Sequence, residues 1–239
     1  MYNIALDAGH CLKTAGKRCL KKLDPNETRE WTLNDRIADK VEMLLQGYTG
    51  WNLIRVDDTT GNKDISTANR AKAANDFKAD DYYSIHHNAG IDGGKGGGIV
   101  AYVCKNADAD TIALQKALYN KLIEKTGLKG NRSNPMPKNN YTVLTKTKMA
   151  ACLCELGFMD SATDVPKILT DEYADQCAAA IVEVMVERGK LVKKSEEPAK
   201  LYRVQTGAFS TRTKAAAQVA ALKKAGFEAI IKEENSVQV

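Results

Sequence analysis

Short apolar stretches alternate along the chain with longer stretches in which apolar residues recur at helical spacing. The short stretches predict strands at 3–7, 52–56, 82–86, 99–104, 141–144 and 151–156. The longer stretches predict helices at 31–45, 67–77, 109–126 and 173–186. This alternation predicts an α/β fold, in which helices flank a twisted, mostly parallel sheet.

The pattern changes near residue 190. Residues 190–200 lose periodicity and gain charge, which is typical of a linker. Beyond them, apolar stretches at 202–206 and 228–232 flank a helical stretch at 211–225. The sequence therefore predicts a large unit over 1–189, a linker over 190–200, and a small C-terminal β-α-β unit over 201–239.

Charge and composition limit the classes of protein to which the chain can belong. The net charge is +5, and it lies wholly in residues 190–239, which carry 10 basic and 5 acidic side chains. A basic tail on a neutral body favours catalysis in the body and attachment to an anionic surface by the tail, although a tail that is merely soluble explains the charge almost as well. We expect no nucleic-acid partner, because neither a basic and aromatic platform nor a dedicated motif accompanies the tail.

Two further observations concern membranes and export. No apolar run approaches the roughly 18 residues that span a bilayer, so we expect no membrane partner. The first ten residues lack the basic start, apolar stretch and cleavage site of a signal peptide. We therefore expect a protein that is made in the cytoplasm.

Candidate chemical residues lie where predicted strands end. His10 and His86 each follow such a strand, and the carboxyl ends of parallel strands are where α/β proteins build their sites. Glu155 lies in an otherwise apolar strand, and a buried acid needs a partner or a chemical role. Imidazole and carboxylate ligands suit zinc, which needs a third protein ligand here. Glu30 is the best candidate for this third ligand, and Glu27 lies close by in the sequence. An alternative explanation for Glu30 is that the helix dipole favours an acidic residue in the first turn of a helix.

The neighbours of His86 leave several alternatives open. His86 and His87 are consecutive in a strand, so their side chains leave on opposite faces, and the pattern alone does not choose between them. Asn88 shares a face with His86 and either binds substrate, orients a ligand or is a plain residue at a strand end. For Arg70 we expect an ion pair that supports the fold.

Several spaced motifs occur in one order along the chain. They are Asp7-Ala-Gly-His10, Glu30-x-x-Leu33-Asn34, Arg70 with Asn75, Ser84-Ile-His86-His-Asn88 and Glu155-Leu-Gly-Phe158. With them, residues 1–189 resemble the zinc-dependent N-acetylmuramoyl-L-alanine amidases of the amidase-3 family. The resemblance implies that His10, Glu30 and His86 hold Zn²⁺ and that Glu155 is the catalytic acid and base. It implies hydrolysis of the amide between N-acetylmuramic acid and L-alanine in peptidoglycan.

The tail resembles the first half of a SPOR module, which binds peptidoglycan. The resemblance lies in Tyr202-Arg-Val-Gln-Thr-Gly-Ala-Phe209-Ser and Leu222-Lys-Lys-Ala-Gly-Phe227-Glu-Ala-Ile-Ile231. Half a module leaves edge strands and an apolar face uncovered. We therefore expect either a homodimer through residues 201–239 or a segment that becomes ordered at the wall.

Several interpretations of the function stay open. The main one is a phage or prophage endolysin, released through holes in the membrane, or a lytic enzyme that acts when a sporulating mother cell breaks open. The alternatives are a zinc peptidase that cuts within stem peptides, and a non-catalytic wall-binding protein on the same scaffold.

Overall fold

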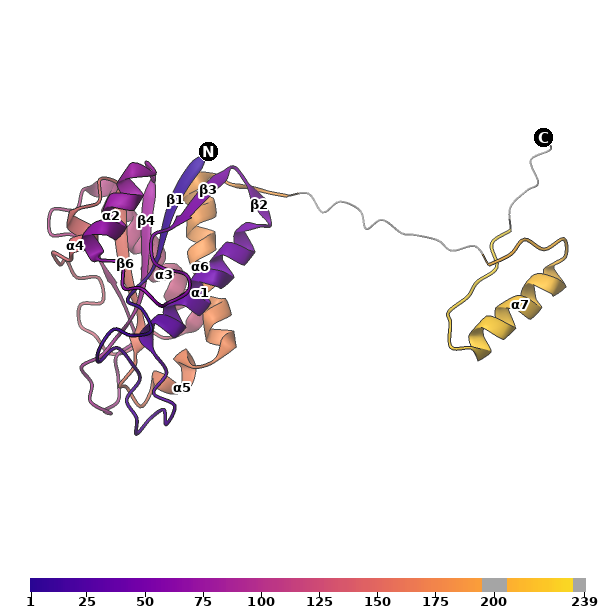
Figure 1. Ribbon diagram of the computed structural model, residues 1–239, viewed down its shortest axis with the longest axis horizontal. Helices are drawn as coiled ribbons and strands as arrows, with labels where there is room; N and C mark the ends of the chain where they lie inside the picture. The colour runs from indigo at the N-terminus through magenta and orange to yellow at the C-terminus, as the bar shows by residue number, and fades with distance from the viewer. Residues whose placement is uncertain (195–205, 234–239) are drawn as a thin grey trace. The chain divides into compact units, whose positions relative to one another are not determined.

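The computed structural model describes residues 1–194 and 206–233. The chain divides into two compact units, Met1–Lys194 and Ser195–Val239. In the first unit a five-stranded sheet has the order β3-β1-β4-β6-β5, and β5 alone runs antiparallel to its neighbour (Figure 1). Its strands are β1 (Tyr2–Ala8), β3 (Trp51–Arg55), β4 (Asp81–Asn88), β5 (Ile99–Tyr102) and β6 (Ala150–Phe158). The mostly parallel α/β sheet expected from the sequence is confirmed.

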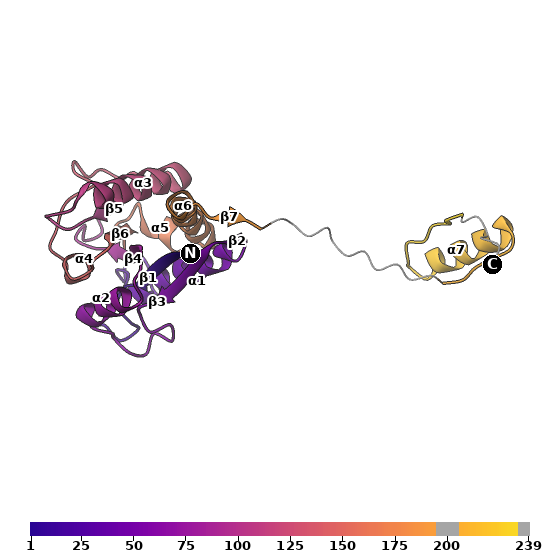
Figure 2. The same ribbon diagram turned by 90° about the horizontal axis from the view of Figure 1, so that it is seen from above.

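Helices cover the two faces of the sheet unequally (Figure 2). On one face pack the three long helices α1 (Glu30–Leu45), α3 (Ala109–Thr126) and α6 (Asp171–Gly189). On the other face lie only α2 (Thr67–Asp76) and α4 (Thr142–Thr145). The smaller apolar cluster under these two helices reaches Leu153 on β6, two residues before Glu155. On this second face, the apolar cluster therefore ends and polar side chains begin at the carboxyl end of the sheet.

Smaller elements complete the first unit. They are the antiparallel pair β2 (Tyr48–Thr49) and β7 (Val192–Lys193), and the short helix α5 (Val165–Ile168). In the described ranges, no helix has the length and apolar character that a membrane crossing requires.

The strand predicted at 141–144 is wrong, because these residues begin the short helix α4. The edge of the sheet beside β5 is taken by the preceding segment, in which the Pro135 carbonyl accepts from Ala101 N at 2.9 Å and Asn139 N donates to Val103 O at 2.8 Å. With this edge occupied, residues 141–144 have no strand to pair with. Val143 and Leu144 are instead buried in the smaller apolar cluster. A short apolar run can bury its side chains as well in a helix as in a strand.

In the second unit the predicted helix is present and the second predicted strand is not. The helix α7 (Arg212–Lys224) begins after Thr211, whose side chain accepts from Lys214 N. Residues 228–232 form neither a strand nor a helix. Of the strand predicted at 202–206, only residue 206 lies within the described residues.

Candidate active site

Three side chains that can bind a metal converge at the carboxyl end of the sheet. His10 follows β1, Glu30 is the first residue of α1, and His86 lies on β4. Their ligand atoms all lie within 4.8 Å of one another, and Glu30 Oε1 is 3.0 Å from His86 Nδ1 and 3.4 Å from His10 Nε2. The close approach of β1 to β4 requires glycine at Gly9, because a Cβ there would overlap the His86 ring.

The donor set fits a catalytic zinc ion. Two imidazole nitrogens and one carboxylate, with a position left open, are the ligands of one class of zinc hydrolase. Burial alone would raise the pKa of Glu30, but hydrogen bonds and charge from His10 and His86 hold it well below its ordinary value, so the side chain is an anion. Its Oε2 is buried and makes no hydrogen bond with the described residues. A buried carboxylate that lies beside two imidazoles and has an oxygen without a hydrogen bond is an arrangement that a cation would satisfy.

His87 leaves on the face opposite to His86 and supports the site from behind. Its ring Nδ1 lies 2.8 Å from Asn34 Oδ1, and Asn34 Nδ2 donates to the Gly9 carbonyl at 3.1 Å. Burial lowers the pKa of His87 to about 3, so the ring is neutral at physiological pH. The tertiary structure thus makes the choice that the sequence pattern left open, and places His86 beside His10 and Glu30.

A buried ion pair holds the turn that carries His10. The Arg70 guanidinium donates to Asp7, to the Ala8 carbonyl at 2.7 Å and to the His10 carbonyl at 2.8 Å. The carboxylate of Asp7 also accepts from Tyr82 at 2.8 Å. Arg70 therefore has the structural role expected from the sequence.

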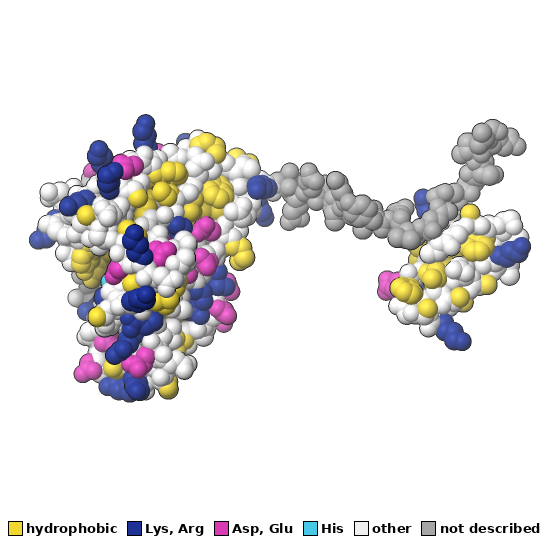
Figure 3. Space-filling model, viewed as in Figure 1, with side chains coloured by type: hydrophobic (Ala, Val, Ile, Leu, Met, Phe, Trp, Pro, Cys, Tyr) yellow, Lys and Arg dark blue, Asp and Glu magenta, His cyan; other side chains and the backbone are white. Residues whose placement is uncertain are grey.

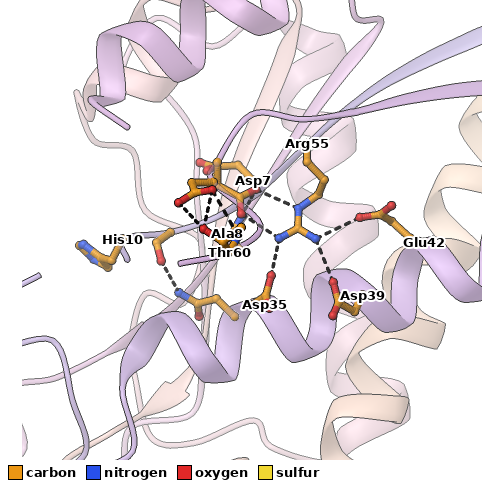
Figure 4. A network of polar contacts seen from close by, with 12 residues as sticks. Asp7, Ala8, His10, Asp35, Asp39, Glu42, Arg55 and Thr60 are labelled. Atoms are coloured by element: carbon orange, nitrogen blue, oxygen red, sulfur yellow. Dashed lines mark hydrogen bonds and ion pairs between the residues drawn. The ribbon is translucent and has the colours of Figure 1, made fainter. Parts of the chain in front are cut away.

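A second arginine connects the same turn to α1 (Figure 4). Arg55 donates to Asp35 at 2.6 Å, to Glu42 at 3.0 Å and to Asp57 at 2.9 Å. Asp57 in turn accepts from Ala8 N at 3.2 Å, two residues before His10. The start of α1, which carries Glu30, and the end of β1 are thus held in one network.

Glu155 lies beside the cluster, on the strand next to His86. The two residues are register partners in the parallel pair β4 and β6. Burial raises the pKa of Glu155 to about 7, although the His86 charge lowers it. A carboxyl group with this pKa both accepts and donates a proton near neutrality.

Glu27 lies apart from this arrangement. Its carboxylate pairs with Arg18 at 3.1 Å, and it is absent from the group of converging ligand atoms. Of the two glutamates that the sequence offered as third ligand, Glu30 is the one that lies beside His10 and His86.

Comparison with protein families identifies the first unit. Residues 4–187 match the family described as N-acetylmuramoyl-L-alanine amidase, and residues 171–233 match the SPOR domain. The chain belongs to this amidase family. The resemblance drawn from the motifs is confirmed, and peptidoglycan is the substrate that both matches indicate.

The amidase is similar to two curated proteins and to a solved structure. It is 28% identical to the sporulation-specific N-acetylmuramoyl-L-alanine amidase of Bacillus subtilis (strain 168), over 97% of this chain and 84% of that protein. It is 30% identical to the endolysin of Bacillus phage SPP1, over 80% of this chain and 67% of that protein. A crystal structure of an N-acetylmuramoyl-L-alanine amidase from Clostridium difficile 630 matches with a TM-score of 0.69 and 27% identity, over 78% of this chain and 95% of that one.

Asn88 is the last residue of β4, two residues after His86. The register of β4 against β6 shifts between His86 and Asn88, so Asn88 pairs with Phe158. Its Oδ1 accepts from Ala89 N at 2.8 Å, and its side chain also contacts Tyr102 on β5.

The sequence reasoning missed three residues of the amidase site. Tyr102 lies near Glu155, and its ring packs against the ring of Tyr141. Lys17 Nζ lies 3.6 Å from Glu30 Oε2. The tyrosines can be recognised as residues near the site only once β5 is known to run antiparallel to β6. Lys17 belongs to the loop 11–29, which has no periodic pattern to mark it.

Proposed function

We propose that the amidase is zinc-dependent, with His10, Glu30 and His86 as the metal ligands and Glu155 as the group that transfers protons. The convergence of two imidazoles on a buried, ionised carboxylate carries this proposal. These three side chains would hold the zinc ion, which would lower the pKa of a bound water molecule to about 7 and would polarise the scissile carbonyl.

Glu155 performs the proton transfers in this proposal. It accepts a proton from the water that attacks the amide carbonyl, and later donates a proton to the nitrogen of L-alanine as the C–N bond breaks. The position of Glu155, beside His86 on the neighbouring strand, supports this role. Asn88 is proposed to hydrogen-bond the substrate from the end of β4.

The experiment that tests the function uses isolated peptidoglycan. The protein is incubated with the wall material, with added zinc and with a chelator, and the products are identified by mass spectrometry. The expected result is new L-alanine amino termini and peptide-free muramic acid, both lost on chelation. Other metal-dependent amino termini would indicate a zinc peptidase, and no cleavage of several wall types would indicate a non-catalytic wall-binding protein.

For the tail, we propose that it binds peptidoglycan and pairs with the tail of a second copy. Apolar side chains gather on the face of this unit seen in Figure 3. Phe227 is 64% exposed and Ile230 is 89% exposed, and α7 has no buried residue. Pairing of two copies would cover these side chains.

Light scattering of the full chain and of a chain without residues 195–239 tests the pairing. The expected result is a dimer for the full chain and a monomer for the shortened one. Two monomers would show that the tail does not pair.

For the biological setting, we propose that the protein acts on the wall after release from the cytoplasm at lysis. Similarity to a phage endolysin over 80% of the chain supports a phage origin. Similarity to a sporulation-specific amidase reaches 97% of the chain, tail included, and gives more support to lysis of the mother cell. A holin gene beside the coding sequence would favour the phage origin.

A further inference from the structure

The amidase site has two flanks of different chemistry, which follow from the order of the strands. From β5 toward β1, the sheet carries in turn Tyr102 on β5, Glu155 on β6 and His86 on β4, with His10 after β1. The loop residue Lys17 contacts Glu30, the ligand that follows His10 along the chain. The catalytic groups therefore lie between an aromatic side and a basic side.

The aromatic side consists of Tyr102 and Tyr141, whose ring centroids are 5.2 Å apart at an angle of 70°. In the antiparallel pair β5 and β6, Val100 lies opposite Glu155 and Tyr102 lies opposite Leu153. Alternation along a strand then places Tyr102 on the same face as Glu155, as its diagonal neighbour. Burial raises the pKa of Tyr102, and Tyr141 and Glu155 raise it further, which is consistent with this proximity.

Tyr141 is exposed but held in place. Its side chain is 37% exposed, so one ring of the pair is open to a ligand. The segment before it is hydrogen-bonded along β5, through the Pro135 and Val103 carbonyls, and α4 begins directly after it. A ring that is fixed before binding loses little conformational entropy when a ligand packs on it.

The basic side consists of Lys17. Its side chain is 43% exposed, and its Nζ lies 3.6 Å from Glu30 Oε2. If Glu30 binds a metal ion, the positive charge of that ion offsets the carboxylate charge that Lys17 pairs with. The Lys17 ammonium group then favours an anion from outside the protein as its partner.

We infer that the substrate lies across the carboxyl end of the sheet in one direction, with the sugar rings of the glycan on Tyr102 and Tyr141 and the stem peptide toward Lys17. Pyranose rings are uncharged and present C–H faces that pack on aromatic rings. The stem peptide carries free carboxylates, which pair with an ammonium group. This inference rests on the proposed function, because the scissile amide must lie between the two sides, at Glu155.

The test compares KM for two soluble muropeptides that carry the same stem peptide, one on a tetrasaccharide and one on a single muramic acid. Tyr141→Ala should raise KM for the tetrasaccharide about 3- to 10-fold, with a smaller effect on the single sugar. Tyr141→Phe keeps the ring and should raise KM for the tetrasaccharide by less than Tyr141→Ala does. Met43→Ala, on α1 and 62% exposed, is the control for loss of an exposed apolar side chain.

Lys17→Gln tests the other side. It should raise KM equally for both glycan lengths, and the effect should vanish when the stem-peptide carboxylates are amidated. Unchanged KM for Tyr141→Ala, or a Lys17→Gln effect that survives amidation, would overturn the inference while the wild-type protein still cleaves. A wild-type protein that does not cleave at the muramoyl amide would instead refute the proposed function.

Discussion

Replacement of Arg70 by methionine should destabilise the first unit strongly, because a buried charge would lose its partner. The Arg70 side chain is 3% exposed and that of Asp7 is 1% exposed, so water does not replace either group. Removal of one partner from a buried pair costs about 3–5 kcal/mol of unfolding free energy. Asp7 keeps its hydrogen bonds from Tyr82 and Ser84, each at 2.8 Å, which places the expected loss toward the lower end of that range.

The pH dependence of stability gives the same pair a second signature. Burial alone would raise the pKa of Asp7, but the Arg70 charge, with smaller contributions from His86 and from hydrogen bonds, holds it below the ordinary value. The pair therefore stabilises the wild-type protein above the unfolded-state pKa of about 3.9, and this contribution is lost as the pH falls through the folded-state pKa. Without Arg70 the burial effect remains and raises the pKa of Asp7. Acidification from neutrality toward pH 4 should then stabilise the variant relative to the wild-type protein.

Urea unfolding of the full chain, followed by tryptophan fluorescence, measures both effects. The two tryptophans, Trp31 and Trp51, lie in the first unit, so their signal reports its unfolding. Arg18→Met is the matched control, because this half-exposed arginine pairs at the surface and should cost less than about 1 kcal/mol. An Arg70→Met protein within about 1 kcal/mol of wild type, with an unchanged pH profile, would refute the reasoning.

Three further predictions concern the site and the tail. Glu155→Gln should lower the rate of amide hydrolysis about 10²- to 10⁴-fold, while the zinc content and the fold stay as in wild type. The control Glu172→Gln, at an exposed residue, should change neither the rate nor the zinc content. An active Glu155→Gln protein would contradict the assigned role. Gly9→Ala should lose bound zinc, because a Cβ at this position overlaps the His86 ring. Elemental mass spectrometry measures the metal content, and retention of full metal content would argue against His86 as a ligand. Deletion of residues 195–239 should leave the urea midpoint of the first unit unchanged and weaken sedimentation with peptidoglycan, whereas a lower midpoint would show that the units stabilise each other.

Much of the site follows from the sequence because parallel strands end at one edge of the sheet. The positions of His10 and His86 after predicted strands are enough to place the two side chains near each other. The choice of Glu30 over Glu27 has a different basis, since spacing alone allows both. Only the folded loop shows that Glu27 pairs with Arg18 while Glu30 turns inward.

The pattern of apolar residues determined which segments are helices or strands wherever the segment was long or its periodicity clear. It failed at 141–144 and 228–232, because a short apolar run suits either structure and a strand exists only where another strand offers a free edge. The tertiary structure alone decided that the segment before Tyr141 occupies the edge of β5, and so brought Tyr141 beside Tyr102. Local sequence sets the period of a segment, whereas hydrogen bonding between distant segments selects its neighbours. The sequence of this amidase therefore predicts which side chains converge at the carboxyl end of the sheet, and the surfaces that surround them depend on the pairing of its strands.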